Sequence, residues 1–175
     1  MKKIVKSKVV TELVRFVNIN IIKPVSHSDI TDFEYSLVFV VPKNETKTIK
    51  KLNDSFDKVI RLNSKFWENK FDNDTIEFLK DGDKLSNNEY FKNTYYLKLS
   101  SRVKPELVDK DINRILDLNE LYDGCYGRVS MTLYPFKIQE ELGVTCELNN
   151  IQKLKEGENL SQKLQIKSPN YKFVK

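Results

Sequence analysis

The chain has 175 residues and a formal net charge of +5, with 30 lysine and arginine residues against 25 acids. Its hydrophobic fraction of 39% suffices for one buried core at this length, which argues against an intrinsically disordered chain. No run approaches the roughly 18 apolar residues of a membrane-spanning helix, and the lysine-rich start lacks the apolar core of a secretory signal, so we expect a soluble intracellular protein.

The first half of the sequence predicts two strand regions. Residues 9–22 are rich in Val, Ile, Phe and Thr, and predict one long strand or two short ones that end at Pro24. Residues 35–41 form a continuous apolar run that stops at Pro42. A run of this kind is typical of a strand that is buried on both faces.

One amphipathic helix is predicted at about residues 45–65. Apolar residues recur there at steps of three or four, on a surface that is otherwise Lys, Asp and Asn. Asn44 or Thr46 is the expected N-cap. The stripe is interpreted as core packing and consists of Ile49, Leu52, Phe56, Val59 and Ile60.

The second half predicts further strands, at residues 78–83, 95–101, 106–108, 125–136 and 142–148. The clearest alternation lies in 125–136, where Cys125, Val129 and Met131 point to one side and the aromatic residues to the other. Many short strands with one inserted helix indicate a mainly β protein, a small antiparallel β-barrel.

Catalytic motifs are missing from the sequence. It has no glycine-rich phosphate loop, no HExxH zinc motif and no nucleophile elbow, so we expect a non-catalytic protein. The pairs Asp81/Asp83 and Asp109/Asp111 leave a metal site open as an alternative, but aspartates are favoured in turns for their own hydrogen bonds. Cys125 and Cys146 lie at inward strand positions and are interpreted as small buried residues.

Aromatic and basic residues alternate on the outward side of strand 125–136. Tyr126, Tyr134 and Phe136 share that side with Arg128, and Tyr96 and Lys98 repeat the pattern on another strand. Unpaired bases stack on such rings while cations neutralise phosphates, so the pattern favours single-stranded nucleic acid. The alternative is that these rings pack beneath the helix or a loop.

Four stretches resemble phage and prophage single-stranded DNA-binding proteins of the podovirus type. They are EYSLVFVVPK at residues 34–43, LKDGD at 79–83, YDGCYGRV at 122–129 and GVTCELNNIQ at 143–152. The resemblance implies an OB-fold barrel with an inserted helix over residues 1–160. It also implies sequence-independent binding of single-stranded DNA in phage replication or recombination, in the cytoplasm of the bacterial host, without catalysis or cofactor.

The partners that this resemblance implies are single-stranded DNA and a replicative polymerase, helicase or recombinase, and a homodimer stays open. The alternative function is a protein–protein interaction module of the same replication or recombination complex. Two departures from the family stand out. Lys104-Pro105 replaces an expected Arg-Pro pair, and residues 161–175 form a basic tail, expected to be flexible, where an acidic tail is expected.

Pattern and resemblance together give one set of candidate nucleic-acid-binding residues. The set consists of Arg15, Lys43, Tyr96, Lys98, Arg102, Lys104, Tyr126, Arg128, Tyr134, Phe136 and Lys153.

Overall fold

The computed structural model describes residues 4–26, 33–71, 77–85 and 88–160. Five strands close into a ring in the order β2–β3–β5–β8–β7 and back to β2. Their bounds are β2 Val14–Ser26, β3 Phe33–Pro42, β5 Thr94–Ser101, β7 Tyr126–Ile138 and β8 Glu141–Lys155. Neighbours in the ring are antiparallel except β5 and β8, which meet in parallel at the single pair Ser100 and Glu147. This order is that of an OB-fold barrel, so the predicted fold class is confirmed.

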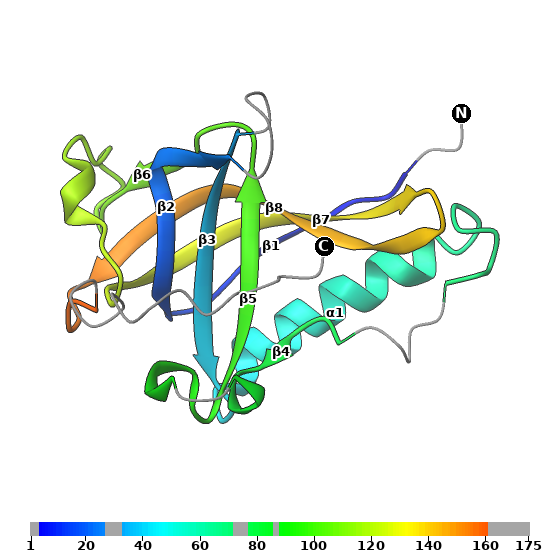
Figure 1. Cartoon of the computed structure of the whole chain (residues 1–175), viewed down its shortest axis with the longest axis horizontal. Coiled ribbons are helices and arrows are strands. Elements are labelled where there is room, and N and C mark those ends of the chain that lie inside the picture. The colour runs from blue at the N-terminus through cyan, green and yellow to red at the C-terminus, as the bar shows by residue number, and fades with distance from the viewer. Residues whose placement is uncertain (1–3, 27–32, 72–76, 86–87, 161–175) are drawn as a thin grey trace.

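Three short strands extend the ring. β1 (Ser7–Val10) pairs with β7, β4 (Lys80–Asp81) pairs with β5, and β6 (Glu106–Val108) runs parallel to β8. In Figure 1, β2, β3 and β5 face the viewer, while the β7–β8 hairpin passes behind them and projects to the right above the helix. None of the helices in the described part of the chain combines the length and apolar character that crossing a membrane requires.

The helix α1 spans Thr46–Leu62, and its stripe faces the core as predicted, with Leu52 and Val59 fully buried. The predicted N-cap is wrong, because the carboxylate of Glu45 accepts the backbone N–H of Thr48 at 2.9 Å. The helix also ends earlier than residue 65. The side-chain amide of the buried Asn63 donates to the Val59 carbonyl at 2.7 Å, which caps the last turn.

The main core fills the ring and the space between the ring and α1. Met131 and Leu133 of β7 face inward, opposite Leu148 and Cys146 of β8, which confirms the predicted alternation. β8 continues well past the predicted end at residue 148. A register shift between Ser130 and Met131 changes which β8 residues face inward, and this breaks the apolar alternation in the sequence beyond that point.

Trp67, the one tryptophan in the sequence, anchors the segment after α1. It is fully buried, its ring stacks on Phe71 at a centroid distance of 4.3 Å, and its indole N–H donates to the Phe136 carbonyl at 2.9 Å. It therefore ties this segment to the projecting hairpin. The predicted tail at residues 161–175 lies outside the described residues, and the extent of the domain stays a prediction.

Candidate nucleic-acid interface

A second apolar cluster lies outside the ring, on the face of β2, β3 and β5 that points away from the main core. We call it the outer cluster, and its buried members are Val17, Val38, Val40, Phe91, Tyr96 and Leu160. Val38 and Val40 alternate along β3 with Leu37 and Phe39 of the main core, so this strand is buried on both faces, as its apolar run predicted.

Tyr96 points outward as predicted, but its ring is covered. Only 9% of the residue is exposed, and the ring packs edge-on against Phe91 at a centroid distance of 5.2 Å. Phe91 belongs to a short 3-10 turn, Glu89–Phe91, that comes just before β5. Tyr96 therefore supports this surface from beneath and does not present an open ring face.

Arg15 on β2 lies beside the outer cluster and between two tyrosines. Its guanidinium carbon is 5.6 Å from the ring centroid of Tyr90 and 5.4 Å from that of Tyr126, and Lys155 approaches the Tyr126 ring at 5.8 Å. The Arg15 Nε donates to the Gly124 carbonyl at 3.2 Å. We call Tyr90, Arg15, Tyr126 and Lys155 the Arg15 stack.

Within the described residues, no carboxylate neutralises the charges of the Arg15 stack. The Arg15 guanidinium contacts the Gly124 and Glu158 carbonyls and two tyrosine rings, and the Lys155 ammonium group contacts the Tyr126 ring. The Tyr90 hydroxyl is buried and has no hydrogen-bond partner within the part of the chain that the structure describes. Two cations without a carboxylate partner among the described residues, together with an unsatisfied hydroxyl, are suited to a polar, anionic ligand.

The motif YDGCYGRV explains how the stack is held. Gly124 has φ of +110°, and a Cβ at this position would lie 1.8 Å from the Glu158 carbonyl oxygen, so only glycine fits. The segment after β8 is further held by the backbone N–H of Leu160, which donates to the Asp123 carbonyl at 2.8 Å. This segment contacts the stack through the Glu158 carbonyl, which accepts a hydrogen bond from the Arg15 guanidinium at 3.5 Å, and it places Leu160 in the outer cluster.

The remaining outward residues of β7 belong to another face. Arg128 and Tyr134 lie where β7 pairs with β8 and, further along, with β1. Tyr134 is eight residues from Tyr126, which corresponds to roughly 26 Å along a strand. The Tyr134 ring has Lys6 at 5.1 Å, and Arg128 forms an ion pair with Glu12 at 3.6 Å. The predicted aromatic strand face is therefore divided between two surfaces.

Phe136 packs on the neighbouring strand of its own hairpin, and not beneath the helix or a loop as the alternative interpretation expected. A Cβ at Gly143 on β8 would lie 2.4 Å from the Phe136 ring, so the ring lies directly on the β8 backbone. Glycine at 143 permits this close approach.

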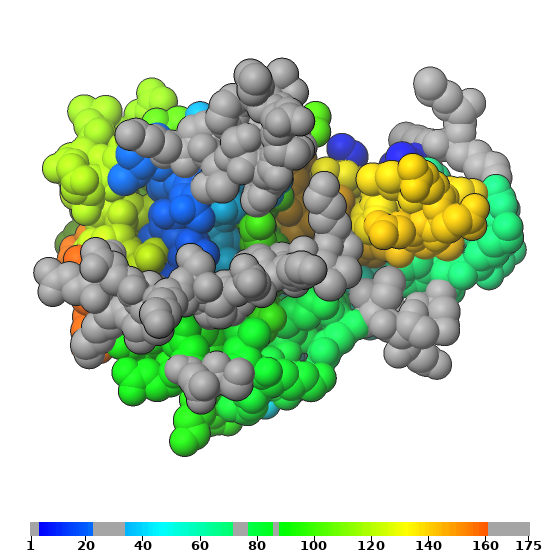
Figure 2. Space-filling view, in the orientation of Figure 1, coloured from blue at the N-terminus to red at the C-terminus, as the bar shows by residue number. Residues whose placement is uncertain are grey.

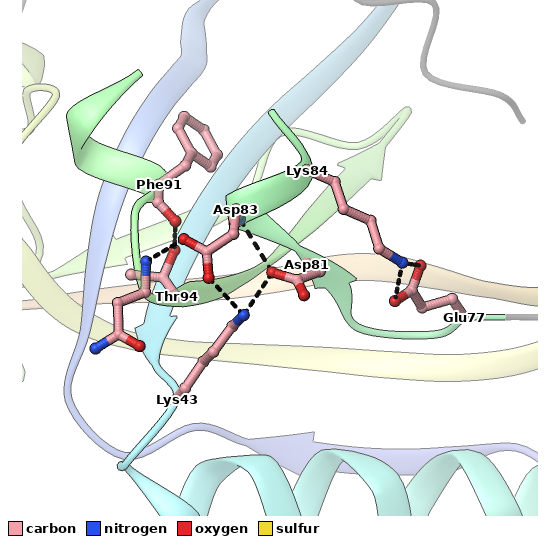
Figure 3. A network of polar contacts seen from close by, with 8 residues as sticks. Lys43, Glu77, Asp81, Asp83, Lys84, Phe91 and Thr94 are labelled. Atoms are coloured by element: carbon pink, nitrogen blue, oxygen red, sulfur yellow. Dashed lines mark hydrogen bonds and ion pairs between the residues drawn. The ribbon is translucent and has the colours of Figure 1, made fainter. Parts of the chain in front are cut away.

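Lys43 at the end of β3 is engaged by two carboxylates (Figure 3). Its ammonium group is 2.7 Å from Asp81 and 2.6 Å from Asp83, and both hydrogen bonds raise the Lys43 pKa, that to Asp81 the more. The Lys43 hydrogen bond lowers the pKa of Asp81. The pKa of Asp83 is lowered chiefly by the Asn93 backbone N–H and then by Lys43. Lys43 therefore joins β3 to the β4 turn and offers no free charge to a phosphate.

We expect Lys43→Met to destabilise the fold at neutral pH and to leave the affinity for single-stranded DNA within about twofold. Because the two aspartate pKa values are lowered in the folded state, the ionised carboxylates stabilise the fold above about pH 4, near the ordinary Asp pKa. This stabilisation is lost as the pH falls through the lowered pKa values of the folded state. The difference in melting temperature between wild type and variant should therefore shrink below pH 4. Thermal denaturation from pH 2 to 7 measures it, with Lys50→Met on α1 as control, and a large loss of DNA affinity would contradict this role.

The other predicted cations have different surroundings. Lys153 is bound to Glu156 at 2.5 Å, with its ammonium group 5.2 Å from the Tyr122 ring, and Lys98 is 3.8 Å from Glu34. Arg102 and Lys104 are exposed in the segment that follows β5. Of the predicted set, the structure brings Arg15 and Tyr126 into contact.

The paired aspartates act in turns. The Asp81 carboxylate accepts the backbone N–H of Asp83 at 3.0 Å, and that of Asp109 accepts the N–H of Asp111 at 2.8 Å. Within the described ranges, no cluster of three or more metal-ligating side chains occurs. Cys146 is buried, and burial raises its thiol pKa to about 12, as expected for a residue that packs in the core.

Sequence reasoning missed Tyr90, Lys155 and Leu160. Tyr90 lies in the 3-10 turn, where no periodic pattern indicates which way a side chain points. Lys155 lies at the end of β8, beyond the register shift that hid this part of the strand. A second apolar alternation that begins at Ile151 would have extended the predicted strand to Lys153 and Lys155. No pattern in the sequence around Leu160 indicates that this residue is buried.

The comparisons with known proteins agree on one group. The family model of the Enterobacter phage Enc34 ssDNA-binding protein matches residues 7–171. The single-stranded DNA-binding protein of bacteriophage Enc34, solved in complex with ssDNA, is similar with a TM-score of 0.72 and 20% identity over 87% of this chain and 88% of that one. Gp2.5, a single-stranded DNA-binding protein of bacteriophage T7, is similar with a TM-score of 0.58 and 11% identity over 88% of this chain and 94% of that one. The search of curated proteins finds no match.

Proposed function

Because the chain belongs to the family of the Enterobacter phage Enc34 ssDNA-binding protein, we propose that it binds single-stranded DNA without sequence preference in phage replication or recombination. It does so without catalysis, by base stacking and phosphate contacts. Family membership is the observation that carries this proposal. The Arg15 stack supplies the two kinds of group that such binding needs.

The DNA lies on the outer face of β2, β3 and β5 and reaches the Arg15 stack at the seam between β2 and β7. In OB folds, ligands bind across the second and third strands of the ring. If β2 is the first strand of the ring, the second and third strands in this protein are β3 and β5. The Arg15 stack borders the same face through Tyr90, which packs against the outer cluster.

Each member of the stack has a role in this proposal. Tyr126 is half-buried and receives a base, because an aromatic ring stacks on any of the four bases and so gives no sequence preference. Arg15 and Lys155 bind the adjacent phosphates, since no carboxylate in the described chain competes for them. The Arg15 guanidinium also lies between the two tyrosine rings and donates to the Gly124 carbonyl, which keeps it in place.

Two substitutions separate stacking from charge. Tyr126→Ala should weaken binding of a dT oligonucleotide by about 1–3 kcal/mol with an unchanged salt dependence, because it removes a stack and no charge. Lys155→Ala should instead reduce the slope of log affinity against log salt by about 0.7, the value for one phosphate contact on a single strand. Fluorescence polarisation at several salt concentrations measures both quantities.

A matched control is Tyr134→Ala on the outer face of β1, β7 and β8, which should leave the affinity nearly unchanged. Equal affinity for duplex and single-stranded DNA would contradict stacking on unpaired bases. A labelled oligonucleotide that is shortened on incubation with the protein and magnesium or manganese would contradict the non-catalytic function.

A further inference from the structure

A loop outside the Arg15 stack exposes large aliphatic side chains. Val103, Ile112 and Leu116 are 73%, 75% and 84% exposed, the three highest values among the exposed large hydrophobic residues in the described chain. All three lie in the segment 102–118, which includes β6. The part of this segment beyond residue 109 forms the yellow-green lobe at the left of Figure 2. Single exposed hydrophobic residues are common on protein surfaces, but three in one short segment indicate an interaction surface.

The turn at residues 109–113 is firmly built and holds Ile112 outward. The Asp109 carboxylate accepts the backbone N–H groups of Asp111 at 2.8 Å and Asn113 at 2.9 Å, and the Ile112 N–H donates to the Asp109 carbonyl at 3.1 Å. Ile112 has φ of +67°, which is unusual for a β-branched residue. A conformation this costly that exposes an isoleucine to water suggests a function for the exposed side chain.

A groove of about 320 Å³ runs between β6 and the segment that folds back along it. Leu116 and Leu118 line one side, and Lys104 and Pro105 line the other. Val103 directly precedes these last two residues. The groove is anchored from below, because the buried Ile115 donates its backbone N–H to the Leu107 carbonyl at 2.9 Å.

The lining of the groove itself carries a small excess of positive charge. Lys104 and Arg114 line the groove, and in the adjoining turn Lys110 lies between Asp109 and Asp111. No carboxylate in the described chain forms an ion pair with any of the three. Glu106 is the one acid among the lining residues, so two cations face one carboxylate.

We propose that this groove docks an acidic segment of a partner protein that carries aliphatic or aromatic anchors. Such a segment would bury Val103 and Leu116 and pair its carboxylates with Lys104 and Arg114. A protein is favoured over nucleic acid because aliphatic side chains have no flat face on which a base stacks. The residues that line the groove are different from those of the Arg15 stack.

The test uses a fluorescein-labelled twelve-residue peptide that alternates Glu or Asp with Leu or Phe, together with two control peptides. One control has lysine in place of the acids, and the other has serine in place of the apolar residues. Methyl NMR of the full chain should show shifts of Val103, Ile112 and Leu116 with the acidic apolar peptide only. Leu116→Ser should weaken its binding at least tenfold, whereas Ile138→Ser, at another exposed apolar residue on the β7–β8 hairpin, should not.

Both variants should bind a dT oligonucleotide as the wild type does, which keeps this inference separate from DNA binding. Absence of shifts up to millimolar peptide, or equal binding of the lysine peptide, would overturn the proposal. So would methyl shifts at this groove on addition of the oligonucleotide alone. A concentration-dependent dimer that Leu116→Ser abolishes would identify a second copy of the chain as the occupant and would also overturn it.

Discussion

Replacing Arg15 with alanine is expected to weaken binding of single-stranded DNA about 30-fold, which corresponds to about 2 kcal/mol. Arg15 carries a charge that no described carboxylate neutralises, and it packs against both Tyr90 and Tyr126. Its loss removes a phosphate contact and also releases the ring on which a base stacks. Fluorescence polarisation with a dT oligonucleotide measures the change.

Arg15→Lys should fall between wild type and Arg15→Ala, because lysine keeps the charge but loses the planar group that stacks. Arg61→Ala on the exposed surface of α1 removes the same charge elsewhere and should have little effect. Circular dichroism must show that Arg15→Ala is folded, since Arg15 also bonds to the Gly124 carbonyl. A folded Arg15→Ala variant with wild-type affinity would show that the Arg15 stack does not bind DNA.

Trp67→Ala is expected to lower the free energy of unfolding by about 3–5 kcal/mol, the usual cost of removing a large buried aromatic side chain. Trp67 is fully buried, stacks on Phe71 and bonds to the Phe136 carbonyl, so its loss leaves a cavity and an unpaired carbonyl. Urea denaturation followed by circular dichroism measures this in both proteins, because the variant has no tryptophan fluorescence.

Trp67→Phe separates packing from hydrogen bonding. This substitution keeps most of the buried ring but removes the hydrogen bond to the Phe136 carbonyl. The free energy of unfolding should therefore fall by only about 1 kcal/mol. Phe66→Ala, at the half-buried neighbour, is the matched control and should cost less than Trp67→Ala. If the free energy of unfolding of Trp67→Ala lay within about 1 kcal/mol of the wild-type value, the role of Trp67 as the anchor of the hairpin would be contradicted.

The elements of the fold were largely predictable because their apolar patterns are local. The stripe of Leu52, Phe56 and Val59 predicted α1, and the alternation of Val129 and Met131 predicted β7. The end of α1 was not predictable, because Asn63 stops the helix through its bond to Val59 and a further bond from its amide to the Val5 carbonyl at 2.8 Å. That contact joins residues far apart in the sequence.

The candidate site was predictable in kind but not in place. The sequence showed that outward rings and cations share strands, and Tyr126 and Arg15 do lie together. It could not show that β7 passes from one surface to another between Tyr126 and Tyr134, because strand pairing sets that course. Nor could it show that Lys43 is held by two carboxylates.

Photo-crosslinking tests most directly where the DNA lies. An oligo(dT) that carries 5-iododeoxyuridine at single positions is irradiated with the full-length protein, and mass spectrometry identifies the attached tyrosines. Binding at the Arg15 stack predicts adducts on Tyr90 or Tyr126. Adducts on Tyr134 with none on either of these two would contradict it, because the strand would then lie on the outer face of β1, β7 and β8.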